Sequence, residues 1–133
     1  MTQREVRDEI FKILFEHEVV GSNISDRKLE VLETLKMSKA KKEFFENYLD
    51  NFMLNEEEIV KKISERVKGW TFSRLATPEK VILKMSFYEI LVEKIGHEIV
   101  INEAVELAKT YGDENTKGFI NGILGDLIRN IEN

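Results

Sequence analysis

The segment with the strongest structural signal reads TPEKVILKMSFYEILVEK and runs from Thr77 to Lys94. Thr77 is a residue type that caps helices, and Pro78 suits the first helical position because that position needs no backbone N–H donor. The apolar side chains that follow recur at helical spacing, but on several sides of the helix instead of along one stripe. A helix of this kind must be covered by others, so the segment predicts the central helix of an all-α fold.

The flanking sequence predicts further helices from capping residues, apolar positions at three- and four-residue spacing, and terminal glycines. Together with the central helix they make about seven, and the others cover approximately residues 2–20, 25–35, 38–52, 55–69, 102–112 and 114–131. The expected caps are Thr2 and Asn55, each with Glu three residues later, and Ser25, Ser38 and Asn102. The pattern indicates one compact helical domain over residues 1–133.

Two short segments fall outside these helices. Residues 70–76 form an expected connector whose apolar anchors are Trp70, Phe72 and Leu75. Val100 and Ile101 are β-branched and leave open a short strand, although a single strand would have no partner.

Composition narrows the class of protein. The chain has 133 residues with a net charge of -5, which argues against nucleic-acid binding through bulk charge but leaves room for a local basic patch. It contains no Cys, which excludes disulfide frameworks, Cys-ligated zinc and thiol catalysis. No apolar run is long enough to cross a membrane, and residues 1–8 do not resemble a signal peptide. We therefore expect a soluble cytoplasmic protein that makes no use of a membrane.

Signals for catalysis are nearly absent. His17 and His97 stand alone, and no phosphate-binding loop or dinucleotide-binding glycine pattern occurs. The many carboxylates fall on polar helix faces, where solvated side chains are the ordinary interpretation. We expect no catalytic residue, no metal and no cofactor.

Two basic clusters and three glycines allow more than one interpretation. Solvated surface is the favoured interpretation of both clusters, which consist of Arg4, Arg7 and Lys12, and of Lys36, Lys39, Lys41 and Lys42. The glycines Gly118, Gly122 and Gly125 fall in one expected helix, where each weakens the helix by roughly 0.5–1 kcal/mol relative to Ala. Tight internal packing, which we assign to Gly122, is the favoured reason. Close approach of a partner or an RNA backbone remains the alternative.

Two aromatic residues are also ambiguous. Phe15 follows an apolar pair in the first helix, and Phe119 lies beside Gly118 in the last. Periodicity alone favours a core position for each. An exposed ring would instead offer a surface that stacks on a base or anchors a partner, which is the role that we assign to Phe119.

Several motifs resemble those of the NusB transcription antitermination family. Residues 101–112 read INEAVELAKTYG and residues 119–124 read FINGIL, close to the family's Ile-Asn-Glu-Ala and Phe-Val-Asn-Gly motifs. Residues 79–84 and 88–91 are similar to the family's central helix. At the start of the chain, Arg4, Arg7 and the run Ile13-Leu14-Phe15 align with its arginine-rich first helix.

The resemblance implies an all-α fold of two packed helical subdomains without enzymatic activity. It also implies that the protein pairs with NusE, a protein of the small ribosomal subunit. The pair would bind boxA, a short single-stranded RNA element of nascent ribosomal RNA leaders, and load an antitermination complex onto RNA polymerase. A weakly basic, acidic protein fits this scheme because a partner could complete the basic track that single-stranded RNA needs.

Carried over position by position, the resemblance implies roles for six residues. The RNA-binding positions are Arg4, Arg7, Phe15, Asn115 and Phe119, and the partner-binding positions are Glu79 and Phe15. The first helix departs from the family pattern because its two arginines are separated by acids, whereas many members carry three or more in a row. We therefore expect RNA binding to depend on the partner.

A rival interpretation is a helical protein-interaction domain, or a self-associating regulator, that does not contact RNA. The sequence leaves the oligomeric state open. Some members of the family self-associate, and an exposed apolar face here could form a homodimer.

Overall fold

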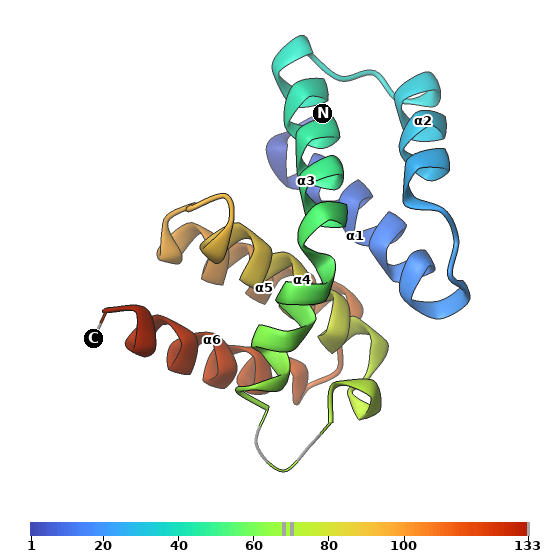
Figure 1. The fold of residues 1–133 in the computed structure, drawn as a ribbon. Helices are drawn as coiled ribbons and strands as arrows, with labels where there is room; N and C mark the ends of the chain where they lie inside the picture. Colours follow the sequence, from blue (N-terminus) through green and yellow to red (C-terminus); the bar gives the residue numbers. More distant parts are fainter. Residues whose placement is uncertain (68, 70, 133) are drawn as a thin grey trace. The chain divides into compact units, whose positions relative to one another are not determined.

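The computed structural model describes residues 1–67, 69 and 71–132, and among them it contains helices but no strand. Their bounds are α1 Gln3–Val20, α2 Ile24–Thr34, α3 Lys39–Ser64, the short 3-10 helix η1 Phe72–Arg74, α4 Thr77–Leu91, α5 His97–Tyr111 and α6 Thr116–Glu132 (Figure 1). The all-α prediction is confirmed. Phe72 and Leu75 lie in the connector as expected, whereas Trp70 lies outside the described residues. No helix in the described ranges is long and apolar enough to cross a membrane.

The helix count is lower than expected because α3 is continuous. The sequence predicts a new helix capped by Asn55, but this residue lies inside α3, where its side-chain nitrogen donates to the carbonyl of Asn51 at 2.7 Å. An Asn followed three residues later by Glu is compatible with both positions. No Gly or Pro interrupts the chain between Phe52 and Ile59, so the helix continues. The predicted break is wrong.

Some predicted caps are confirmed. The Thr2 backbone N–H donates to Glu5 Oε1 at 2.7 Å, and the Glu5 N–H donates to Thr2 Oγ1 at 3.1 Å, which is a complete capping box. Ser38 Oγ accepts from the Lys41 N–H at 3.3 Å. Gly21 ends α1 with a φ of 70°, a left-handed conformation that favours glycine.

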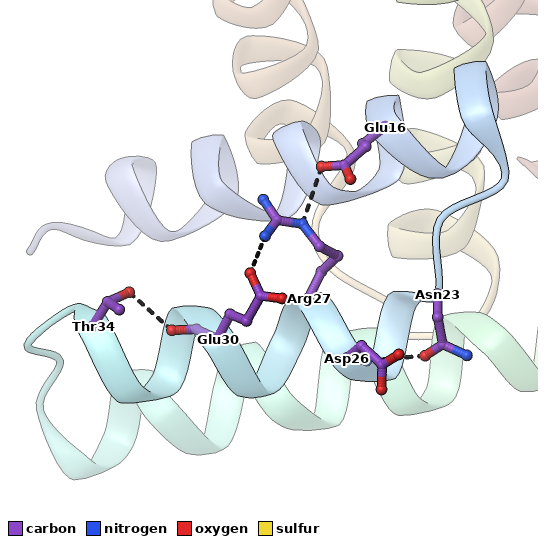
Figure 2. Close-up of polar contacts among 6 residues, drawn as sticks. All are labelled: Glu16, Asn23, Asp26, Arg27, Glu30 and Thr34. Atoms are coloured by element: carbon purple, nitrogen blue, oxygen red, sulfur yellow. Dashed lines mark hydrogen bonds and ion pairs between the residues drawn. The ribbon is translucent and has the colours of Figure 1, made fainter.

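Three helix starts are displaced from their predicted positions. Asn23, and not Ser25, caps α2, because Asn23 Oδ1 accepts from the Asp26 N–H at 2.9 Å (Figure 2). The cap of α4 is Ala76 instead of Thr77, and Glu79 Oε1 accepts the Ala76 N–H at 3.1 Å. A side chain three residues on can therefore supply the missing cap from inside the helix.

The third displaced start concerns α5, which begins at His97 and not at Asn102. Val100 and Ile101 therefore lie in a helix, and the alternative of a short strand is wrong. Val100 is buried, so tertiary packing overrides its β propensity.

By its internal contacts the chain divides into two compact units, residues 1–55 and the residues from Glu56 onward, so that the boundary falls within α3. In the N-terminal unit, α1 and α3 bury Val6, Ile10, Leu14, Phe45 and Phe52. α2 adds the buried Ile24 and Val31 to this core, and polar contacts join it to α1 and α3. Arg27 Nε donates to Glu16 of α1 at 3.0 Å and its Nη1 pairs with Glu30 (Figure 2), while Lys28 Nζ lies 2.8 Å from Asp50 of α3.

The C-terminal unit is built around α4, as the sequence predicts. Every residue from Val81 to Ile90 is buried, and α4 contacts both α5 and α6. Burial includes Lys84, whose Nζ lies 2.8 Å from Glu56 Oε2 and 5.7 Å from the centre of the Phe72 ring. A buried cation is tolerated here because it has both a carboxylate and an aromatic face as partners.

Candidate nucleic-acid interface

The first helix presents its two arginines in different environments. Arg4 is exposed, whereas Arg7 is only 6% exposed and its guanidinium carbon lies 5.4 Å from the centre of the Phe44 ring of α3. Phe44 in turn meets Tyr48 edge-on, with 5.7 Å between the ring centres. Arg7 is therefore held by aromatic packing within the N-terminal unit.

Phe15 lies at the margin of the core. Its side chain is half-buried, and its ring centre is 5.8 Å from that of the buried Phe11. Eleven residues separate Arg4 from Phe15, so helical geometry puts them within roughly 20° of the same face and about 16 Å apart. α1 thus carries a guanidinium and a partly exposed ring along one line.

Acidic neighbours reduce the positive charge of α1, as the sequence suggests. Lys12 Nζ lies 3.4 Å from Asp8 and 3.2 Å from Glu9, and the hydrogen bond to Glu9 raises the pKa of Lys12. Hydrogen bonding to Thr2, through its backbone first and its side chain second, lowers the pKa of Glu5, so this carboxylate is ionised and serves the helix cap.

The lysine cluster at the start of α3 has a different character. Lys36, Lys39 and Lys42 are exposed, Lys41 is half-buried, and no ion pair joins any of them to another described residue. The first turn of α3 has no acidic residue to balance them, so their charges oppose the helix dipole.

In the C-terminal unit, three of the sequence-predicted residues meet around one hollow of about 410 Å³. We call it the connector hollow, and its lining is Arg74, Leu75, Ala76, Glu79, Asp113, Asn115 and Phe119. Glu79 comes from the first turn of α4, Asn115 from the α5–α6 loop and Phe119 from the first turns of α6. These segments are far apart in the sequence, so only the fold brings the three side chains together.

The walls of the connector hollow are held by hydrogen bonds at two helix starts. Glu79 is half-buried and caps α4 through the Ala76 N–H, as described above. Asp113 Oδ1 accepts from the Asn115 N–H at 2.8 Å and from Thr116 Oγ1 at 3.2 Å, while the Asp113 N–H donates to Thr116 Oγ1 at 2.9 Å. The loop is therefore ordered around Asp113, which leaves the exposed Asn115 side chain at the mouth of the hollow.

Sequence reasoning missed Arg74 and Asp113. Arg74 is exposed and brings a cation to the hollow. The sequence signal that could have identified it is its position in the connector, just before the start of α4. With it, the hollow combines a guanidinium, an amide and a half-buried aromatic ring with two carboxylates. Such a set can stack on a base and hydrogen-bond its edge.

The glycines of α6 do not pack as expected. Gly118 and Gly122 are exposed, and a Cβ atom added to either would meet no heavy atom of the described residues within 4 Å, apart from its chain neighbours and the backbone of its own helix. At Gly125 the added atom would meet Arg129 Nη1 at 3.4 Å. The prediction that Gly122 packs against a neighbouring helix is wrong, because no other element of the described residues covers its face of α6.

Known proteins resemble this chain along nearly its whole length. A family model described as the NusB family matches residues 4–129. A transcription antitermination protein NusB of Pediococcus pentosaceus is 37% identical over 131 residues, covering 97% of this chain and 98% of the relative. The solved structure of T. maritima NusB superposes with a TM-score of 0.86 at 33% identity, over 97% of this chain and 92% of that one.

A further solved structure contains a complex. It is described as antitermination factors NusB and NusE in complex with dsRNA, and its matching chain has a TM-score of 0.83 at 26% identity. The match covers 97% of this chain and 98% of that chain.

Proposed function

The chain belongs to the NusB family, and on that premise we propose that it acts in transcription antitermination as a non-enzymatic adaptor between RNA and a protein partner. The observation that carries the proposal is the connector hollow. It gathers Glu79, Asn115 and Phe119, the residues that the family motifs single out in this half of the chain. Residues 1–133 would act together as one NusB-like domain in the cytoplasm, where nascent RNA is made.

The proposed protein partner is NusE, the small-ribosomal-subunit protein. Support comes from the related NusB that was solved together with NusE and RNA. Phe15 and Glu79 are the proposed partner contacts. Each is half-buried, so each offers part of its side chain to a docking surface while the rest is held by its own helix.

The proposed RNA ligand is the single-stranded boxA element, through which the pair would load an antitermination complex on RNA polymerase. Phe119 is suited to stack on a base, and Asn115 can hydrogen-bond a base edge in either direction because its amide both donates and accepts. On α1, the exposed Arg4 is suited to a phosphate, and Arg7 would contribute charge from its position against Phe44.

A second candidate function rests on an apolar surface in the C-terminal unit. Ile99 is 53% exposed and Ile131 is 46% exposed, and both line a hollow of about 700 Å³ with Leu91 and Ile95. Exposed apolar side chains that gather around a hollow are typical of protein-binding surfaces. A domain that only binds proteins, or a homodimer, is therefore the alternative.

A gel-shift experiment separates the two candidates. The protein, the NusE of the same organism and a labelled boxA RNA are mixed singly, in pairs and together, beside an RNA of the same composition in scrambled order. We expect a ternary complex that forms with boxA and not with the scrambled RNA. A stable complex with NusE that shifts neither RNA would overturn the RNA-binding proposal and favour the alternative.

A further inference from the structure

A second hollow in the C-terminal unit shares Phe119 with the connector hollow. It measures about 430 Å³ and is formed by one face of α6 together with Arg66 and Val67, which follow α3. We call it the glycine hollow, because Gly118 and Gly122 line it. Phe119 lines both hollows, so a ligand in either one can contact this residue.

The charges in the glycine hollow are incompletely paired. Arg66 Nη1 lies 3.7 Å from Asp126 Oδ2, and Arg129 Nη2 lies 3.9 Å from Asp126 Oδ1. Both distances exceed that of a good hydrogen bond, and one carboxylate faces two guanidinium groups. The two arginines and the one aspartate together carry a net charge of +1.

Arg66 also carries an unused donor. Its Nε atom is buried and has no hydrogen-bond partner among the residues that the structure describes, although its side chain lines the hollow. Burying a donor without an acceptor is unfavourable, and charged groups raise that penalty. A rotation of this side chain, which is 21% exposed, would bring Nε to an acceptor atom on a bound anionic ligand and remove the penalty.

The two glycines leave room for a flat group. They are one helical turn apart, and the space where each Cβ would project is empty to at least 4 Å. Glycine inside a helix is unfavourable, and no element of the described chain packs closely enough on these two to require it. The floor of the hollow is therefore bare backbone beside an aromatic ring.

We propose that the glycine hollow holds one nucleotide of the same RNA strand that occupies the connector hollow. The base lies on the Gly118–Gly122 backbone next to Phe119, and its phosphate lies by Arg66 and Arg129. A strand that crosses the Phe119 ring then puts neighbouring nucleotides into the two hollows. The inference rests on the proposed RNA-binding function and adds a second nucleotide position to it.

An acidic peptide is a weaker candidate for this hollow. Its carboxylate could meet the guanidinium groups, but it has no planar group that would use the bare backbone beside Phe119. A nucleotide supplies both the anion and the flat ring, so the observed combination favours RNA.

Two variants test the proposal in the complete complex of the protein, NusE and fluorescent boxA RNA, with affinity read by anisotropy. Gly122→Leu puts a side chain into the unoccupied space above residue 122 and so fills the hollow. We expect RNA affinity to fall about tenfold, because the base can no longer lie there. Arg129→Gln removes a cation whose side chain is 71% exposed, and we expect the log–log salt slope to become shallower by about 0.7, the contribution of one phosphate on a single strand.

The matched control is Asn121→Leu. Asn121 is exposed on the same helix next to Gly122 but lines neither hollow, so the same apolar side chain is added outside the site. We expect this variant to bind like the unmodified protein. Circular dichroism checks that Gly122→Leu is folded. If it is not, the salt slope of Arg129→Gln still tests the proposal.

The outcomes separate this inference from the proposed function. RNA binding by the unmodified complex, with unchanged affinity in Gly122→Leu and an unchanged salt slope in Arg129→Gln, would overturn the glycine-hollow inference alone. Equal losses from Gly122→Leu and Asn121→Leu would also overturn it, because the effect would then not be specific to the hollow. No RNA binding by the unmodified complex would overturn both.

Discussion

Arg7 is a cation that is almost completely buried. A substitution at this position therefore tests the stability of the fold as well as RNA contact. Its guanidinium lies against the Phe44 ring and its side chain is 6% exposed. We expect Arg7→Glu to lower the free energy of unfolding by about 2–3 kcal/mol, because a buried carboxylate would replace a cation over an aromatic face. Urea denaturation measures this, with Arg7→Lys as the conservative control. A fully stable Arg7→Glu would contradict the structural role.

Arg4 is the residue that tests RNA contact on α1 without disturbing the fold, because it is exposed. Arg4→Glu is expected to weaken boxA binding by the ternary complex by about 1–2 kcal/mol, as for the loss of one charged hydrogen bond. The thermal midpoint should stay nearly constant. Lys42→Glu, an exposed charge reversal in the lysine cluster, should do much less, and equal losses from the two would mean that the RNA track includes α3.

Phe119 is half-buried, whereas Phe87 of α4 is 0% exposed. Comparing alanine substitutions at the two residues therefore distinguishes a role in binding from a role in the core. Phe119→Ala should reduce RNA affinity by about 1–3 kcal/mol through lost stacking. Phe87→Ala should instead destabilise the protein by about 3–5 kcal/mol. Thermal denaturation and RNA titration of both variants provide the comparison. If Phe119→Ala unfolds the protein as readily as Phe87→Ala, the ring belongs to the core and the functional assignment fails.

At the scale of the element, the continuity of α3 makes Asn55 an interior residue and not a cap. Asn55→Ala should therefore raise the free energy of unfolding slightly, by about 0.5 kcal/mol, because Ala is the better helix former. Thr2→Ala is the control at a true cap, where a loss of about 1 kcal/mol is expected. A loss at Asn55 as large as that at Thr2 would indicate a helix start near residue 55.

The last helix gives a second test of stability. Gly122→Ala is expected to raise the free energy of unfolding by about 1 kcal/mol, since the new methyl group meets no described residue within 4 Å outside its own stretch of helix. Chemical denaturation measures the change. A destabilised variant would show that the face is covered after all.

How far an element can be predicted depends on how local its causes are. The capping box of Thr2 and Glu5 involves residues three apart, and the all-round apolar pattern of α4 requires burial on every side, so both could be predicted from the sequence. Asn55 has the same local pattern as a cap, and the absence of Gly and Pro around it permits a continuous helix without requiring one. Which face of α6 is left uncovered at Gly122 depends on other elements of the fold, so periodicity could not show it.

The candidate site shows the same limit. Family motifs pointed to Glu79, Asn115 and Phe119 one by one, but their meeting in one hollow depends on contacts between segments far apart in the chain. Arg74 joins that hollow from the connector, where no periodic pattern draws attention to a single charged residue.

At the scale of the whole molecule, the net charge of -5 sets the expected binding behaviour. RNA binding should be weak alone, stronger with NusE and sensitive to salt. If about three to four phosphates are neutralised, the log–log salt slope should be roughly -2 to -3 for a single strand. Titrations over a range of KCl concentrations, with and without NusE, measure it. Tight boxA binding by this protein alone, unchanged by NusE, would contradict the expectation.

The unpaired lysines at the start of α3 have a consequence for the evolution of the chain. Lys36, Lys39 and Lys42 form no ion pair with another described residue, and they lie in or just before the first turn of α3, where positive charge opposes the helix dipole. Because positive charge is unfavourable at a helix N-terminus, we expect neutral substitutions there to leave stability nearly unchanged, so selection on stability does not preserve these charges. Over generations, positions 36, 39 and 42 should gain and lose lysine with the ligands and the ionic strength that each lineage meets, while the buried Val6 and Ile10 stay apolar.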